Sequence, residues 1–360
     1  MSPRFSLASI NTGLLHKLSL VDRYYIMKID VHVHVISIAP SNGGYVSRRM
    51  QRSLSFRYLA FKMGFNRGKA PEQKDALYVN MLADHVRCSQ LNSVVVLAFD
   101  EIYNESGAVD TGVTSLYVAN DYVRDIKNRY PELFLYGASV HPYRIDAIDE
   151  LERVKEQGAV LVKLLPNSHG FDPSAKKLVP YYRALARLEL PLLVHCGYEH
   201  TIPIIDQRFG YPRLLKRALD EGVKVIIAHA GSSGRFHFHE TFGDFLKLIE
   251  KYPNCYGDTS ALTNIWRSKY LFELLNLEKL NRKYGVRIDN IQNRLIHGSD
   301  YPIPITPSAF IGRTNGHARR TVRRMDNPLQ LDIELKRLAG LTEDCLSRTA
   351  EVLGIKDDRS

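Results

Sequence analysis

The sequence lacks any apolar run near the roughly 18 residues that a membrane-spanning helix needs, so we expect no membrane partner. It also lacks CxxC pairs. Its four cysteines lie far apart, which argues against a zinc ribbon or a disulfide scaffold and favours a reducing compartment, the cytoplasm. Residues 1–26 show neither a continuous apolar centre nor a small-residue cleavage site. We interpret them as an N-terminal extension before a single domain over residues 27–360.

Nucleic-acid binding is not expected despite the formal net charge of +10. A basic protein could bind nucleic acid through its charge alone. Much of this charge is local, as in Arg319, Arg320, Arg323 and Arg324, and no groove-reading motif accompanies it. Hydrophobic residues make up 44% of the chain and charged residues 24%, which is ordinary for a globular protein with a substantial core.

Eight short apolar segments recur along the chain, and many are followed by stretches with the apolar spacing of amphipathic helices. Continuous apolar runs of this length are typical of strands buried on both faces of a parallel sheet. Repeated strand–helix alternation predicts an α/β fold of the closed (β/α)₈ type, the TIM barrel. An open doubly wound sheet is the alternative, but no GxGxxG follows any of the strands. The predicted strands are Ile26–Val35, Ser93–Asp100, Leu133–His141, Ala159–Pro166, Pro191–Gly197, Val223–Gly231, Cys255–Ala261 and Arg294–Tyr301.

Two segments depart from a minimal barrel. Residues 36–92 form a long insertion after the first predicted strand, which either stands over the active-site face as a lid or packs around the rim. Residues 327–355 are predicted to form helices that close the barrel, with a helix stop at Gly340.

Polar side chains with metal-binding chemistry follow the apolar parts of several predicted strands. His32 and His34 are two residues apart, so in a strand they project to the same side. Active sites of barrels form at the carboxyl ends of the strands, which is where these side chains lie. Imidazole and carboxylate ligands together suit Zn²⁺ and related divalent ions. The other strand-end residues of this set are Lys163, His195, His229 and Asp300.

On these residues the sequence resembles the amidohydrolase superfamily, in particular its amidohydrolase-related branch of metal-dependent hydrolases and decarboxylases. The resemblance rests on Asp-Val-His-Val-His, Gly-Phe-Asp-Pro, Leu-Val-His-Cys-Gly, Ala-His-Ala-Gly and Gly-Ser-Asp-Tyr-Pro, and it spans residues 28–355. It implies a divalent metal, most simply Zn²⁺, bound by His32, His34, His195 and Asp300. It also implies that Asp300 is the general base. His229 would be a catalytic acid/base or, in a two-metal site, a second-metal ligand.

Lys163 separates two versions of this site. In two-metal members of the superfamily a lysine at the corresponding strand end is carboxylated and bridges the ions, so Lys163 would be a ligand only in that case. Lys-Leu-x-Pro also occurs in single-metal members, where the lysine packs or contacts substrate. We favour one ion, with two as the alternative.

Three residues outside the metal set are predicted to contact the substrate: Arg144, His169 and Arg235. An arginine could hold a substrate carboxylate through two parallel hydrogen bonds, and the alternative for each residue is ordinary loop hydrogen bonding. The sequence thus predicts hydrolysis of an ester, lactone or amide of a small molecule, and a carboxylate on that molecule would be the group that Arg144 binds. The alternative is nonoxidative decarboxylation of a small unsaturated or aromatic acid. A homodimer is the expected assembly.

Overall fold

A computed structural model describes residues 27–68, 70–199, 201–232 and 241–355 of the chain. The predicted N-terminal extension and Arg235 therefore lie outside the described residues.

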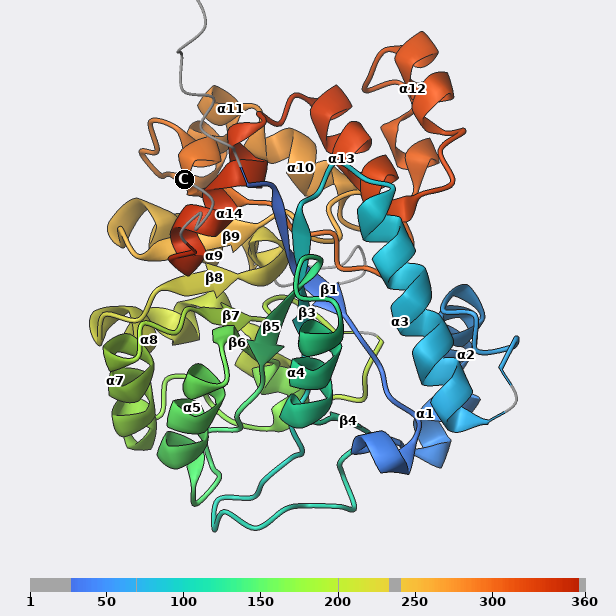
Figure 1. The fold of residues 1–360 in the computed structure, drawn as a ribbon. Coiled ribbons are helices and arrows are strands. Elements are labelled where there is room, and N and C mark those ends of the chain that lie inside the picture. The colour runs from blue at the N-terminus through green and yellow to red at the C-terminus, as the bar shows by residue number, and fades with distance from the viewer. Residues whose placement is uncertain (1–26, 69, 200, 233–240, 356–360) are drawn as a thin grey trace, which may run out of the picture. The chain divides into compact units, whose positions relative to one another are not determined.

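An eight-stranded parallel sheet forms the centre of the domain (Figure 1). Its spatial order follows the chain order, with each strand beside the next. The prediction of a (β/α)₈ barrel is confirmed, and every predicted strand contains an observed one. The observed strands are shorter because their carboxyl-terminal residues bend into the loops that carry the polar side chains. The strands are β1 (Ile29–His34), β3 (Ser93–Leu97), β5 (Phe134–Ala138), β6 (Ala159–Leu164), β7 (Leu192–Val194), β8 (Val225–Ile227), β9 (Cys255–Asp258) and β10 (Leu295–Ile296).

The sheet closes between its first and last strands through single backbone hydrogen bonds instead of a regular ladder. The amide of Val31 donates to the carbonyl of His297 at 3.0 Å, and that of His34 donates to the carbonyl of Tyr301 at 2.8 Å. The amide of Asp300 donates in return to the carbonyl of His32 at 2.9 Å. This closure places the end of the last strand directly beside the two histidines of the first.

The strands bury both faces, as continuous apolar runs predict. Ile29, Val31 and Val95 belong to the core inside the barrel, whereas Val33 belongs to the larger core between sheet and helices. Pairing of β1 with β3 is irregular between Asp30 and Val33. An irregularity of this kind re-aims the side chains that follow it.

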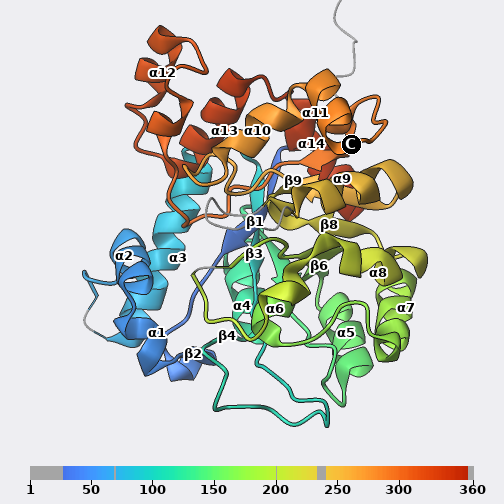
Figure 2. The ribbon, with the colours of Figure 1, turned by 180° about the vertical axis from the view of Figure 1, so that it is seen from behind.

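Helices surround the barrel, and in Figure 2 the helices of the insertion lie on the other side of the view from the helices within residues 147–156, 179–187 and 216–220. Residues 147–157, 175–188 and 211–221, which have the apolar spacing of amphipathic helices, contain α5 (Ala147–Glu156), α7 (Val179–Arg187) and α8 (Lys216–Asp220), the last two each preceded by a short 3-10 turn. Beyond the insertion the α-helices are α4 (Asn120–Arg129), α5 (Ala147–Glu156), α6 (Pro166–His169), α7 (Val179–Arg187), α8 (Lys216–Asp220), α9 (Phe242–Lys251), α10 (Ser268–Leu274), α11 (Leu277–Tyr284), α12 (Gly316–Val322), α13 (Pro328–Ala339) and α14 (Asp344–Leu353).

Among its described residues, the insertion after β1 holds a 3-10 turn (Pro40–Asn42), one strand and three α-helices. Its strand β2 (Gly44–Val46) pairs antiparallel with β4 (Leu116–Val118), which lies beyond the insertion. Helix α3 (Pro71–Arg87) packs along the barrel and contacts α13, while α1 (Arg48–Arg52) and α2 (Leu54–Lys62) lie against each other. The insertion was predicted either to stand over the active-site face or to pack around the rim, and different parts of it do each. Helix α3 packs on the rim, whereas α1 and α2 line the cavity described below.

The tail confirms the helical closure and the helix stop. Gly340 caps α13 with a φ of 107°, a conformation that glycine adopts without steric cost. Helix α14 covers β1 and β10. On α13 the buried ammonium of Lys336 donates to Asp332 and, at 2.7 Å, to the carbonyl of Gly298. The tail thereby holds the segment that leads into Asp300.

Across the described ranges, no helix combines the length and the apolarity needed to traverse a bilayer.

Candidate metal and catalytic site

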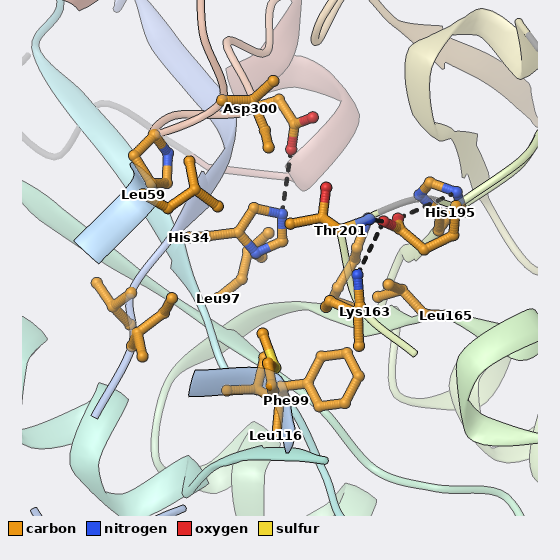
Figure 3. Close-up of a pocket in the computed structure, with 17 residues that line it drawn as sticks. His34, Leu59, Leu97, Phe99, Leu116, Lys163, Leu165, His195, Thr201 and Asp300 are labelled. Carbon is orange, nitrogen blue, oxygen red and sulfur yellow. Dashed lines mark hydrogen bonds and ion pairs between the residues drawn. The ribbon is translucent and has the colours of Figure 1, made fainter. Parts of the chain in front are cut away.

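The two histidines of β1 meet at one point. Their Nε2 atoms lie 3.2 Å apart, and both lie near Oδ1 of Asp300, at 3.4 Å for His32 and 3.1 Å for His34. His32 is buried, and the side chain of His34 is 26% exposed. Figure 3 shows Asp300 facing the ring of His34 across this short gap. The three side chains converge as the strand spacing predicted.

Asp300 reaches this point through an unusual backbone conformation. Its φ is 65°, and His229, on the segment after β8, has a φ of 57°. Such conformations cost about 1–3 kcal/mol each in residues other than glycine and persist where surrounding structure enforces them, often at functional sites. Gly298 allows the close approach, because a Cβ there would meet the Cβ of His32 at 3.0 Å.

Asp258, at the end of β9, orients His32. Its Oδ2 accepts a hydrogen bond from Nδ1 of His32 at 2.7 Å, and its Oδ1 accepts from the amides of His229 at 2.7 Å and Ser260 at 3.0 Å. With Nδ1 as the donor, Nε2 of His32 carries the lone pair and points at Asp300 and His34. A carboxylate behind a histidine is the usual arrangement that orients a metal ligand. Because its oxygens already accept these bonds, Asp258 itself is disfavoured as a ligand.

The geometry of the three ligand atoms fits a divalent cation. Tetrahedral coordination with bonds near 2.0–2.1 Å separates neighbouring ligand atoms by roughly 3.3 Å. The observed separations of 3.1–3.4 Å agree with this value. Among the described residues Nε2 of His195 has no hydrogen-bond partner, but it lies 3.5 Å from Oε2 of Glu199, and His195 is not in the group whose ligand atoms converge. His32, His34 and Asp300 therefore fit a metal ion.

His195 and His229 form a second pair beside the first. Nε2 of His229 lies 3.2 Å from Nδ1 of His195, and Nδ1 of His229 lies 2.8 Å from Oγ of Ser260 and 3.9 Å from Oδ2 of Asp300. The second oxygen of Asp300 thus faces a histidine while the first faces the two histidines of β1.

Lys163 lies at the floor of the site on β6. Its Nζ is 3.1 Å from Nε2 of His32, and the side chain is almost fully buried. Burial lowers the pKa of Lys163 to about 8, against the opposing pull of Asp258 and Asp300. The lysine therefore adjoins the proposed ligands, as both versions of the site require.

Burial also sets the charge state of the histidines. It lowers the pKa of His32 and His229 well below the ordinary value and lowers that of His195 to about 3. Neutral imidazole is the form that binds metals.

A cavity of about 690 Å³, open solvent at its mouth included, begins at these residues. Its polar lining consists of His34, Lys163, His195, Glu199, Thr201 and Asp300, and the remaining lining is apolar.

Two residues predicted to contact substrate do not reach this cavity. Arg144 pairs with buried Asp100 at 3.3 Å and with Asp146 at 2.9 Å, so its guanidinium is already engaged. His169 is fully buried, with its ring 4.6 Å from that of Phe99, which itself lines the cavity. Both residues follow the ends of barrel strands, as predicted. However, carboxylates hold Arg144 and an aromatic ring holds His169 behind the cavity wall.

Glu199 and Arg267 are residues at the site that the sequence did not single out. Oε2 of Glu199 lies 3.5 Å from Nε2 of His195. Burial acts to raise the pKa of Glu199, but His195 and the amides of Thr201 and Ile202 hold it below the usual value. Arg267 donates to the carbonyls of Ser232 and, at 3.1 Å, Tyr198. Both residues lie in loops without a motif, so only their proximity reveals them.

Comparison with known proteins agrees with the fold. The profile of the amidohydrolase family matches residues 29–309. The chain belongs to the amidohydrolase family. This enzyme family is metal-dependent, in keeping with the cluster of His32, His34 and Asp300. No functionally curated protein matches this amidohydrolase significantly.

Solved structures resemble this amidohydrolase in fold at low identity. A provisionally named 2-pyrone-4,6-dicarboxylic acid hydrolase from Pseudomonas putida is 15% identical with a TM-score of 0.56, and the match covers 93% of this chain and all of that one. An uncharacterized TIM-barrel protein from Bordetella bronchiseptica is 14% identical with a TM-score of 0.55, covering 91% and 99%. A 5-carboxyvanillate decarboxylase from Sphingomonas paucimobilis is 12% identical with a TM-score of 0.50, covering 92% and 100%. Hydrolases and decarboxylases thus share this barrel.

Proposed function

We propose that this amidohydrolase hydrolyses an ester, lactone or amide of a small molecule with the help of one divalent ion, Zn²⁺ in the simplest case. The observation that carries the proposal is the placement of Asp300. Its Oδ1 lies with the two histidines of β1, its Oδ2 faces His229, and its side chain lines the cavity.

His32, His34 and Asp300 would hold the ion, and His195 would be the fourth ligand that the family resemblance implies. When bound, a divalent ion supplies the Lewis acidity that activates water and polarises a carbonyl near neutral pH. Asp300 accepts the proton of the attacking water and returns it to the leaving group. His229, whose Nδ1 lies 3.9 Å from Oδ2 of Asp300 and whose ring stacks on that of His32, would act as an acid/base beside the ion. Lys163 orients the substrate carbonyl at the cavity floor.

A panel of p-nitrophenyl esters, small lactones and anilides tests this proposal with metal-loaded protein. We expect turnover of at least one of these classes, abolished by a chelator and restored by Zn²⁺. Protein that contains stoichiometric metal and turns over none of these compounds would contradict hydrolysis.

Decarboxylation is the second candidate, and Lys163 favours it. An ammonium buried beside the proposed metal ligands could neutralise the carboxylate of a bound acid, which apolar surroundings would otherwise exclude. Incubation with a panel of hydroxybenzoic acids and measurement of released CO₂ distinguishes this reaction from hydrolysis.

Metal stoichiometry separates the one-ion and two-ion versions of the site. We expect one equivalent of metal per chain and, because Lys163 is then not a ligand, the same content in Lys163→Ala. Elemental analysis of both proteins measures this directly. Two equivalents in the natural protein and one in the variant would instead indicate a bridging, carboxylated Lys163.

Asp258→Asn is expected to weaken metal binding by about 10–100-fold, because His32 loses the charged acceptor that orients its ring and raises its basicity. Competition with a chromogenic chelator measures the change. Asp289→Asn, which alters an exposed carboxylate, serves as the control. An unchanged affinity in Asp258→Asn would show that Asp258 does not support the ligand.

A further inference from the structure

The cavity wall opposite the polar residues is apolar and is built mainly by segments outside the barrel strands. Met50 on α1 and Leu59 on α2 come from the insertion, and Leu116 comes from β4. Phe99 lies just beyond the end of β3. In Figure 3, Phe99 and Leu116 lie together on the side of His34 away from Asp300, and Leu59 lies on a third side.

This wall is pre-formed. Met50, Leu59, Phe99 and Leu116 are each between 3% and 6% exposed, so neighbouring residues hold them in place before any ligand arrives. When an apolar group of a ligand moves from water to this wall, the side chains of the wall are already ordered, so binding loses little conformational entropy. A charged group there would be desolvated without a partner.

Partners for a second carboxylate are scarce along this wall. Lys163 is the only lysine or arginine among the described residues that line the cavity, and it lies at the polar end. Arg144, the predicted carboxylate contact, is paired with Asp100 and Asp146 outside the lining.

We infer that the substrates of this amidohydrolase join one reacting polar group to an uncharged apolar group, an alkyl chain or an aryl ring. The polar group lies at His34, Lys163 and Asp300, and the apolar group packs against Met50, Leu59, Phe99 and Leu116. The helices α1 and α2 of the insertion are thus specificity determinants. The inference rests on the proposed function for the position of the reacting bond, but the binding preference holds for either reaction.

A binding experiment tests the wall independently of turnover. The dissociation constants of hexanoate and of adipate, which is a six-carbon chain with a second carboxylate, are measured by calorimetry on metal-loaded protein. We expect hexanoate to bind at least about 10-fold more tightly, because adipate must bury an unpaired charge. Equal affinities, tighter adipate or no binding of hexanoate would each overturn the inference.

Substitutions on α2 test whether the insertion causes the preference for hexanoate over adipate. Leu59→Arg places a cation in the wall and should reduce the preference for hexanoate over adipate at least 10-fold. Leu54→Arg makes the same change on α2 at a position that is 81% exposed and should leave the preference unchanged. Circular dichroism confirms folding, and Leu116→Ala, which should weaken hexanoate but not acetate, provides a milder second variant. Equal losses in Leu59→Arg and Leu54→Arg would contradict the assignment.

Measurements of turnover distinguish the proposal of hydrolysis from the proposal that the apolar wall selects the substrate. Hydrolysis of p-nitrophenyl esters consumes one water, cleaves the acyl C–O bond and releases p-nitrophenol and the acid. From acetate to hexanoate, kcat/KM should rise by about two- to fourfold per methylene. Turnover without this dependence would contradict the apolar wall and leave hydrolysis standing. Hexanoate binding without turnover of any ester, lactone or anilide would contradict hydrolysis and leave the wall standing.

Discussion

Asp300→Asn is expected to lower kcat by about 10²–10⁴-fold while the protein retains part of its metal. The amide still offers an oxygen at the position of Oδ1, next to His32 and His34, but it cannot take a proton from water. Loss of a general base affects turnover more than binding. We therefore expect KM to change little and elemental analysis to find metal in the variant.

Asp289→Asn changes an exposed carboxylate that is not part of the cavity lining, so it is the matched control and should retain full activity. Near-normal turnover in Asp300→Asn would refute the general-base role. A variant without metal would instead show that the carboxylate acts chiefly as a ligand.

Removing the imidazole of His32 should have the second large effect. In His32→Ala we expect metal affinity to fall by about 100-fold or more, because loss of an outer partner of a ligand alone costs 10–100-fold. Activity should fall with it and recover only in part at high metal concentration. Elemental analysis of protein purified without added metal, followed by Zn²⁺ titration, measures both quantities.

His317→Ala, which changes an exposed histidine, controls for the loss of an imidazole in general. Thermal unfolding in the presence of chelator controls for stability, since Asp258 is left without its buried partner in His32→Ala. Unchanged metal content in a folded His32→Ala protein would exclude His32 as a ligand.

Much of the fold could be predicted because parallel strands buried on both faces leave a strong sequence signal. Apolar runs such as Ser93–Asp100 and Ala159–Pro166 each contain an observed strand. Their ends were less predictable, because residues such as His195 and Asp300 continue the run in sequence but leave the ladder in the structure. Backbone conformations with positive φ, as at His229, have no reliable sequence signal in residues other than glycine.

The core of the candidate site was predictable for a related reason. Strand-end positions of a parallel barrel share one face, so His32, His34, Lys163, His195, His229 and Asp300 were expected to lie close together. Contacts of 3.1–3.9 Å between their polar atoms link all six. Arg144 and His169 satisfied the same rule yet lie behind the wall, because pairing with Asp100 and packing on Phe99 depend on neighbours that are distant in sequence.

By itself, the sequence determined the barrel and the set of residues able to bind a metal, because periodicity and strand-end position are local properties. Only the tertiary structure decided the orientation of those side chains and the residues that surround them. The irregular pairing within β1 separates Val31, inside the barrel, from Val33 outside it, just where His32 and His34 turn toward Asp300. Residues from α1, α2, β4 and the segment after β3 together line the apolar wall. A surface assembled from segments that are distant in sequence exists only once the chain has folded.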